Sequence, residues 1–211
     1  MKITKLGHCC LVIEEAGKTI VTDPGMYTDR QNELAGVDVV VITHEHQDHF
    51  HVDSVKKILQ NNPQAAIITN TAVGKLLEKE GIAHQVVDGG QFVQFGGMQF
   101  AGYGSEHADI YRTVPRVQNT GYFIGGRLFY PGDAFFNPDR PVEILALPVA
   151  GPWMRIADAL DYALAVRPKH MFPVHDASMK SPACVHAMVK NIVSAEGLDF
   201  TVPPEDGVME F

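Results

Sequence analysis

The sequence predicts an α/β (α+β) fold in which strands followed by helices occur twice along 211 residues. Three observations support this prediction. Short β-prone runs fill the first part, a nearly continuous apolar run spans residues 37–43, and a second group of β-prone and amphipathic segments begins near residue 91. Because each half can form a sheet with helices outside it, and no Ser/Gly-rich linker divides the chain, we expect one domain over residues 1–211.

The first half contains the most apolar predicted strand. We expect strands at 2–6, 10–14, 18–22, 37–43, 65–69 and 84–87, and helices at 52–60 and 71–80. The apolar run 37–43 is typical of a strand that is buried on both faces. We expect Thr71 to cap the second helix, because its hydroxyl can accept from the first turn, and Gly81 to follow the end of that helix.

The second half is richer in hairpins. We expect strands at 91–95, 98–103, 118–124, 127–130, 143–148 and 169–172, and helices at 155–166 and 181–195. Gly96-Gly97 and Gly125-Gly126 are typical two-residue hairpin turns. Pro168 is expected to stop the first of these helices, and Pro182 to lie in the first turn of the second.

Composition narrows the possible partners and compartments. The chain has 17 basic and 25 acidic residues, a net charge of −8, and no run of Lys and Arg. This balance argues against nucleic acid and against a polybasic membrane anchor as partners. There is no signal-peptide pattern and no apolar run of roughly 20 residues for a membrane span. Three cysteines, two of them adjacent, form a poor disulfide framework, so we expect a cytoplasmic protein, and homo-oligomers stay possible.

The strongest motif is the segment 44–49, which reads His-Glu-His-Gln-Asp-His directly after the predicted strand 37–43. Sites in α/β proteins often lie at the carboxyl ends of strands. If the backbone stays extended, His44 and His46 point the same way and can share one metal ion. Asp48 and His49 follow as the chain turns and can face a second ion. Imidazole and carboxylate ligands suit Zn, Fe, Mn or Co better than Ca or Mg.

This segment resembles the His-X-His-X-Asp-His signature of the metallo-β-lactamase superfamily, and the resemblance extends over nearly the whole chain. It implies a four-layer αββα sandwich. Further residues that match the ligands of the family follow later predicted strands. The resemblance implies two metal ions, one held by His44, His46 and His107, the other by Asp48, His49 and His175, with Asp133 bridging them. The resemblance also implies that Asp23 supports the metal loop through hydrogen bonds without binding metal.

A narrower resemblance is carried by Leu6-Gly7-His8, the hydrophobic hairpin after it, and Val21-Thr22-Asp23-Pro24. These features look like the branch that contains ascorbate-phosphate lactonase and uncharacterised metal-dependent hydrolases. The implied function is a dinuclear metal-dependent hydrolase that uses a metal-bridging hydroxide on a small-molecule ester, lactone or phosphate-bearing substrate. Asp48 and Asp133 would be the catalytic carboxylates. Zinc is the first choice of cofactor because the site is rich in histidine, with Mn and Fe as alternatives.

Other residues are candidates for lining the pocket. This set contains His8, Arg112, Arg116, Trp153 and Arg155. Guanidinium groups after His107 can clamp a phosphate or carboxylate, or they can be solvated loop charges. Two alternative functions stay open. A phosphodiesterase or nuclease of the same fold is disfavoured by the negative charge, and a non-catalytic metal-binding sensor or scaffold is disfavoured by the complete ligand set.

Overall fold

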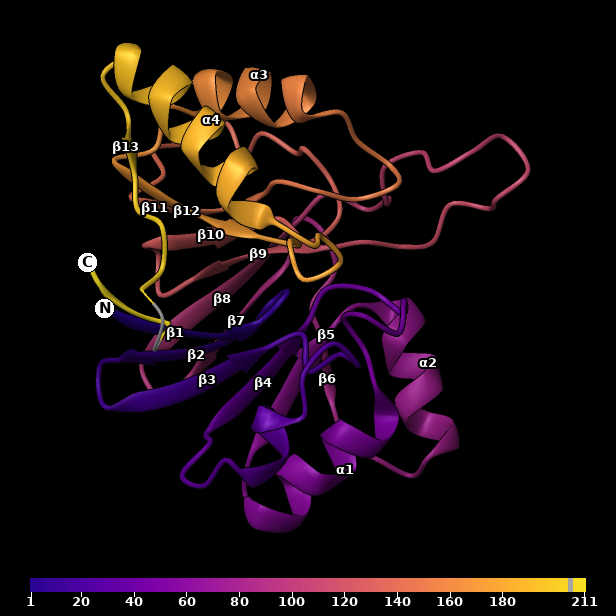
Figure 1. Cartoon of the computed structure of the whole chain (residues 1–211). Coiled ribbons are helices and arrows are strands. Elements are labelled where there is room, and N and C mark those ends of the chain that lie inside the picture. Colours follow the sequence, from indigo (N-terminus) through magenta and orange to yellow (C-terminus); the bar gives the residue numbers. More distant parts are fainter. Residues whose placement is uncertain (205–206) are drawn as a thin grey trace.

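The computed structural model describes residues 1–204 and 207–211 and contains two seven-stranded sheets that pack face to face (Figure 1). The first sheet has the order β14 (Val208–Glu210), β1 (Lys2–Gly7), β2 (Cys10–Glu15), β3 (Lys18–Thr22), β4 (Val39–Ile42), β5 (Ala66–Thr69) and β6 (Gln85–Val86). The second has the order β13 (Asp199–Phe200), β12 (His170–Val174), β11 (Ile144–Pro148), β10 (Leu128–Tyr130), β9 (Gly121–Ile124), β8 (Met98–Tyr103) and β7 (Phe92–Phe95).

Helices cover the outer face of each sheet. Figure 1 shows α1 (Val52–Asn61) and α2 (Thr71–Lys79) outside the first sheet, and α3 (Ile156–Val166) and α4 (Pro182–Ala195) outside the second. The four-layer αββα sandwich is thereby confirmed. No helix in the described ranges, 1–204 and 207–211, combines the length and apolar character that a membrane crossing requires.

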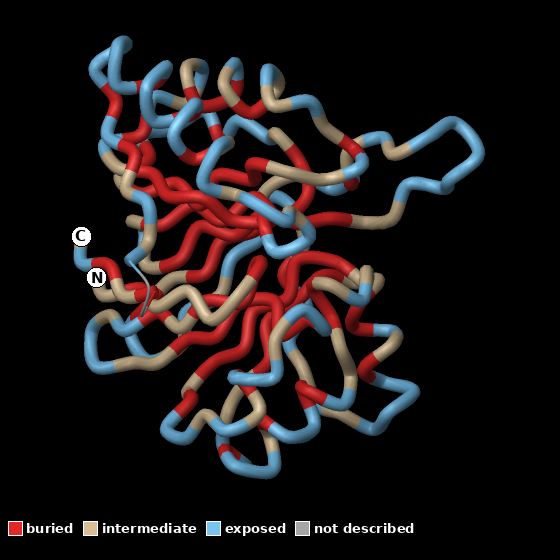
Figure 2. The backbone as a smooth tube through the Cα atoms, viewed as in Figure 1, coloured by how far each residue is buried: buried red, intermediate tan, exposed pale blue. Residues whose placement is uncertain are grey.

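Three hydrophobic cores hold the layers together. One lies between the two sheets, and one lies between each sheet and its helices, as the buried segments in Figure 2 show. The strand β4 contributes to two of them, because Val39 and Val41 belong to the central core while Val40 and Ile42 pack toward α1 and α2. This alternation explains the continuous apolar run and confirms a strand that is buried on both faces.

Two turn predictions are confirmed and one cap prediction is wrong. Both Gly-Gly pairs adopt positive φ angles, as hairpin turns of this type require. Thr71 does not cap α2. Asn70 precedes it in an extended conformation, and its side chain accepts a hydrogen bond of 3.1 Å from the backbone N–H of Val73. Thr71 is the first helical residue, and its hydroxyl instead donates to Asp88 at 2.7 Å, which ties the helix to the loop after β6.

The sequence patterns did not predict three short elements. These are a 3-10 helix at Arg30–Glu33 and the strands β13 and β14. Each has only two to four residues, too few for hydrophobic periodicity to be visible. The strand β14 returns to the first sheet by pairing with β1, so the two halves of the chain are not entirely separate.

The strand directions bring five chain segments to one edge of the sandwich. In the first sheet β3, β4 and β5 are parallel, and in the second β10, β11 and β12 are parallel. The strand β8 also runs in the direction of β10, because both are antiparallel to β9. The segments that follow β3, β4, β8, β10 and β12 therefore emerge together, as expected for a site at the carboxyl ends of strands.

Candidate metal centre

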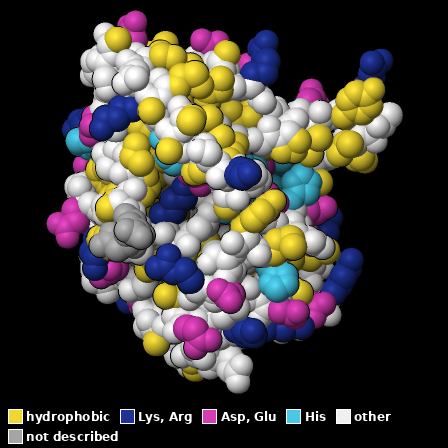
Figure 3. All heavy atoms as spheres, in the orientation of Figure 1, with side chains coloured by type: hydrophobic (Ala, Val, Ile, Leu, Met, Phe, Trp, Pro, Cys, Tyr) yellow, Lys and Arg dark blue, Asp and Glu magenta, His cyan; other side chains and the backbone are white. Residues whose placement is uncertain are grey.

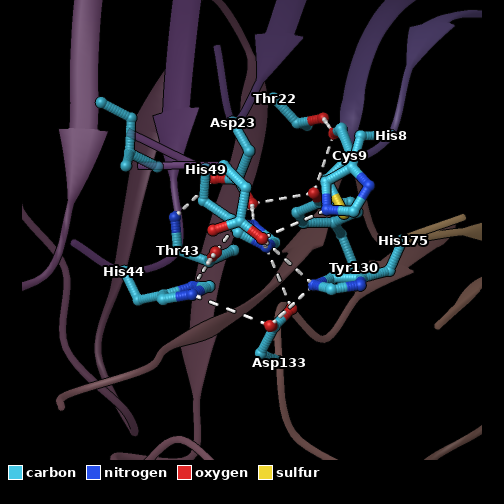
Figure 4. Close-up of polar contacts among 12 residues, drawn as sticks. His8, Cys9, Thr22, Asp23, Thr43, His44, His49, Tyr130, Asp133 and His175 are labelled. Carbon is cyan, nitrogen blue, oxygen red and sulfur yellow. Dashed lines mark hydrogen bonds and ion pairs between the residues drawn. The ribbon is translucent and has the colours of Figure 1, made fainter. Parts of the chain in front are cut away.

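All seven predicted ligand residues meet at this edge. They form two groups in which the candidate ligand atoms lie within 4.8 Å of one another. The first cluster consists of His44, His46 and His107, and the second cluster consists of Asp48, His49, Asp133 and His175. Figure 4 shows side chains of both clusters pointing toward one another, from segments far apart in the sequence.

Asp133 lies between the two clusters. Its Oδ2 atom is 2.9 Å from Nε2 of His175 and 3.3 Å from Nε2 of His107. Its Oδ1 atom is 3.1 Å from Nε2 of His49. One carboxylate therefore contacts histidines of both clusters, which is the position that a bridging ligand requires.

The second ring nitrogen of several histidines is held by an oxygen atom. Nδ1 of His44 is 3.0 Å from Oγ1 of Thr43, and Nδ1 of His107 is 2.6 Å from the carbonyl of Ala108. Nδ1 of His49 is 2.7 Å from Oδ2 of Asp23. A proton on each Nδ1 satisfies these contacts, and the lone pair of each Nε2 then faces the centre.

Asp23 organises this outer layer of contacts. Its carboxylate accepts from the backbone N–H and the hydroxyl of Thr43, at 2.8 and 2.7 Å, and from the Tyr130 hydroxyl at 2.8 Å. It belongs to neither cluster of candidate ligands. The sequence-based expectation placed Asp23 in this role but missed Thr43 and Tyr130. Thr43 had the signal of directly preceding the motif, whereas nothing in the sequence connects Tyr130 to Asp23.

The loop that begins with Asp23 also packs against the motif. The backbone N–H of Met26 donates to the carbonyl of Gln47 at 2.9 Å. A β-carbon at Gly25 would lie 1.9 Å from the carbonyl oxygen of Asp48, so only glycine allows this close approach. The position of Asp48 is therefore set partly by backbone packing.

The polar atoms that face the centre fit a metal ion. Within the described part of the chain, Nε2 of His44, His49, His107 and His175 and Oδ1 of Asp133 are buried and make no hydrogen bond of good geometry, although Asp133 lies within ion-pairing distance of the last three rings. Buried polar atoms without partners are rare and costly. Five of them converging from different segments are explained if a ligand satisfies them together, and nitrogen and oxygen donors of this kind suit divalent transition metals.

The two clusters differ in their electrostatics. Burial holds the pKa of His44 well below its usual range and also lowers the pKa of His46. In the second cluster, burial alone would raise the pKa of Asp133, but the neighbouring His49 and His175 outweigh it and keep that pKa well below normal. Burial likewise opposes protonation of His175, but Asp133 outweighs this effect and raises the pKa of His175 to about 10.

The centre is open on one side. The side chain of Asp48 is 24% exposed and His46 is half-buried, whereas the other five candidate ligands are buried. Histidine side chains reach the molecular surface beside hydrophobic ones (Figure 3). A substrate therefore has access to the centre from the side of His46 and Asp48.

The structure separates the candidate pocket residues. The ring centroid of Trp153 lies 5.9 Å from that of His107 and 5.8 Å from that of His175, so its indole forms a wall of the centre. Arg155 points away, because its side chain is 83% exposed and pairs with Asp158 of α3. The sequence-based expectation that Arg155 belongs to the pocket wall with Trp153 is not supported by this placement.

The two other arginines lie on the long loop after His107, which projects from the body of the protein in Figures 1 and 2. Arg112 is exposed, with its guanidinium 5.6 Å from the ring centroid of Tyr111. Arg116 pairs with Asp109 and with Glu106. It also lines a cavity of about 360 Å³ together with His107. Only Arg116 is thus near a candidate ligand, and its charge is already balanced.

His8 and Cys9 also reach the second cluster. His8 is 2% exposed, and its Nε2 is 3.2 Å from Oδ2 of Asp48. The buried thiol of Cys9 lies in a group with donor atoms of His8, His49 and His175. His8 is one of the residues that the sequence suggests for the pocket, whereas Cys9 was considered from the sequence only as a disulfide partner. The adjacency of Cys9 to His8 was the available signal.

Comparison with known proteins gives a family match over most of the chain. A family model described as the β-lactamase superfamily domain matches residues 2–175. Protein Rv0786c of Mycobacterium tuberculosis is 31% identical over 216 residues, covering all of both chains. A metal-dependent hydrolase of Methanocaldococcus jannaschii is 25% identical, covering 82% of this chain and 83% of its own.

A solved structure extends the comparison to the fold. The metallo-β-lactamase fold protein YhfI from Bacillus subtilis superimposes with a TM-score of 0.73, covering 100% of this chain and 99% of its own at 13% identity. At this identity the likeness concerns the fold alone. The sequence-based resemblance to metal-dependent hydrolases agrees with these findings.

Proposed function

Since the chain belongs to the metallo-β-lactamase superfamily, we propose that it is a metal-dependent hydrolase with a dinuclear centre formed by the first and second clusters. The observation that carries this proposal is the position of Asp133, whose two carboxylate oxygens face histidines of both clusters. A shared carboxylate is expected where two cations lie a few ångströms apart.

Zinc is the preferred cation in this proposal, because imidazole nitrogen atoms dominate the donor set. Manganese and iron also accept nitrogen and oxygen ligands, and cellular supply can decide among them. Two divalent cations would supply a water-derived nucleophile near neutral pH and polarise the bond under attack.

The residues of the chain have distinct tasks in this proposal. His44, His46 and His107 would hold one cation, and Asp48, His49 and His175 the other, with Asp133 shared. Asp23 fixes the ring of His49 directly and that of His44 through Thr43. Trp153 limits the space beside the centre. Asp48, which faces the open side, would accept a proton from the attacking water and pass it on.

We further propose a small-molecule ester, lactone or phosphate-bearing substrate. The net charge of −8 disfavours nucleic acid as a partner, and the cavity of about 360 Å³ beside His107 is of a size for a small ligand. The free thiols of Cys9, Cys10 and Cys184 support a cytoplasmic location. In this proposal one hydrolase domain spans residues 1–211, and the formation of homo-oligomers stays open.

The test combines metal analysis with turnover on the same sample. Protein purified without chelators should contain about two cations per chain and should hydrolyse at least one member of a panel of lactones, thioesters and phosphodiesters. Asp133→Ala should abolish this turnover. Absence of both metal and turnover, even after reconstitution with Zn or Mn, would contradict the proposal and favour a scaffold or sensor.

A further inference from the structure

His8 occupies the tight connection between β1 and β2, beside the second cluster. Its φ angle is +51°, in the left-handed region, and its side chain is 2% exposed. Its ring offers a donor atom to a group with Cys9, His49 and His175. Two roles are therefore conceivable for this imidazole. It can coordinate a cation directly, or it can hold another ligand in place.

The hydrogen bond on the far side of the ring distinguishes these roles. The backbone N–H of Ala177 donates to Nδ1 of His8 at 3.3 Å. A nitrogen that accepts this bond carries no proton, so the proton of the neutral ring is on Nε2. A protonated Nε2 has no lone pair for a cation. It can instead donate to Oδ2 of Asp48, which lies 3.2 Å away.

Further contacts fix the ring in this orientation. The carbonyl of His8 accepts from the backbone N–H of His175 at 3.2 Å. The ring packs between those of Tyr27 and His175, with centroid distances of 4.5 and 4.1 Å. His8 thus connects three segments, namely the β1–β2 connection, the motif that follows β4 and the loop that follows β12.

His8 contacts the oxygen of Asp48 that faces the second cluster. Oδ2 of Asp48 also lies 3.5 Å from Nε2 of His175 and 3.7 Å from Nε2 of His49, so it faces the second cluster. A carboxylate oxygen has two lone pairs and can accept a hydrogen bond while it binds a cation. The N–H of His8 can therefore restrain this oxygen without competing for the cation.

We propose that His8 is a positioning residue that donates from Nε2 to Asp48 and aims this carboxylate at the cation held by the second cluster. This inference rests on the proposed function, because it assumes that Asp48 binds a cation. Outer contacts to metal ligands typically change metal affinity by about 10- to 100-fold when they are removed.

Three substitutions separate donation from coordination. His8→Ala removes the donor and should lower the affinity for one of the two zinc ions by about 10- to 100-fold. His8→Gln keeps an N–H donor on a side chain that binds metals poorly, and should recover most of the affinity. His8→Glu offers a metal-binding carboxylate without a donor, and should not recover it. His170→Gln is the matched control, because His170 also contacts a carboxylate, that of Asp199 at 2.8 Å, outside both clusters.

Affinity for each zinc ion would be measured by competition with a chromophoric chelator, after circular dichroism has shown that each variant is folded. Recovery by glutamate but not by glutamine would overturn the proposal, since His8 would then act as a ligand. Equal zinc affinity in all variants would overturn it as well, while leaving the proposed function intact. Failure of the unmodified protein to bind zinc would instead refute the proposed function itself.

A second measurement needs no substitution. Nitrogen-15 NMR of the folded protein distinguishes the two tautomers of a neutral histidine. Protonation of Nε2 in His8, both before and after zinc is added, is the expected result. Protonation of Nδ1, or loss of the Nε2 proton on zinc binding, would overturn the proposal.

Discussion

The first and second clusters are oriented by contacts of different range. In the first, the rings of His44 and His107 are held by Thr43 and Ala108, their immediate neighbours in sequence. In the second, His49 is held by Asp23, 26 residues away, and Asp48 is contacted by His8, 40 residues away. The geometry of the first cluster is therefore mainly local, whereas that of the second depends on several segments packing correctly.

The clusters also differ in charge. The first contains imidazoles, and burial lowers the pKa of His44 and His46. The second contains two carboxylates, Asp48 and Asp133, whose pKa values are lowered. The pKa values of His49 and His175 are raised, so in the metal-free protein protonated histidines balance the charge of these carboxylates. Cation binding at the second cluster must therefore displace protons, and at the first it need not.

The largest expected effect comes from removing Asp133, the carboxylate that contacts histidines of both clusters. Asp133→Ala should lower the affinity for both cations and lower turnover by more than about 100-fold. The loss of a shared ligand should have a larger effect than the loss of an outer contact, which typically lowers metal affinity or activity by about 10- to 100-fold. Metal content and initial rates would be measured on the same preparation. Retention of both cations at full affinity would show that Asp133 does not join the clusters.

A smaller effect is expected from Asp23→Asn, and it should be unequal. Asp23 contacts His49 directly but reaches His44 only through Thr43. The affinity of the second cluster for its cation should therefore fall more than that of the first cluster, by about 10- to 100-fold. Asp38→Asn is a suitable control, since Asp38 pairs with Lys18 and Thr19 outside both clusters. An equal loss of affinity for both cations would contradict the distinction between local and long-range orientation of the ligands.

The charge difference predicts a pH dependence of the metal-free protein. The pKa of His175 is raised from 6.5 to about 10 in the folded state, so its protonated ring stabilises the fold fully below pH 6.5. This stabilisation is lost as the pH rises toward about 10. Thermal unfolding of chelator-treated protein should therefore shift to lower temperature across this window. Metal-loaded protein should shift less, because the cation replaces the proton, and a rise in Tm of the metal-free protein would contradict the prediction.

The smallest effects are expected where side chains are exposed and belong to neither cluster. Arg112→Ala and Arg155→Ala remove exposed guanidinium groups and should change the free energy of unfolding by no more than about 0.5 kcal/mol. Turnover should stay close to that of the unmodified protein. A large rise in KM for either variant would return that arginine to the substrate pocket.

The sequence was sufficient to predict which candidate ligand residues come together, because each follows a strand and matches a position of a known motif. It could not reveal the contacts that orient them. The bond from Tyr130 to Asp23 joins residues 107 positions apart and depends on the packing of β10 against the end of β3. The outward direction of Arg155 was equally hidden, because it follows from the local pairing with Asp158 at the start of α3.

The division of the ligands between the two sheets has a consequence for the order of assembly. The motif after β4 belongs to the first sheet, whereas His107, Asp133 and His175 all follow strands of the second. While the chain emerges from the ribosome, β1 to β6 can pair before any of these three partners has been synthesised, and only β14 joins the first sheet after them. Neither cluster is complete at that stage, so capture of the proposed cations would be a late folding event, and the bound cations would connect segments of both sheets.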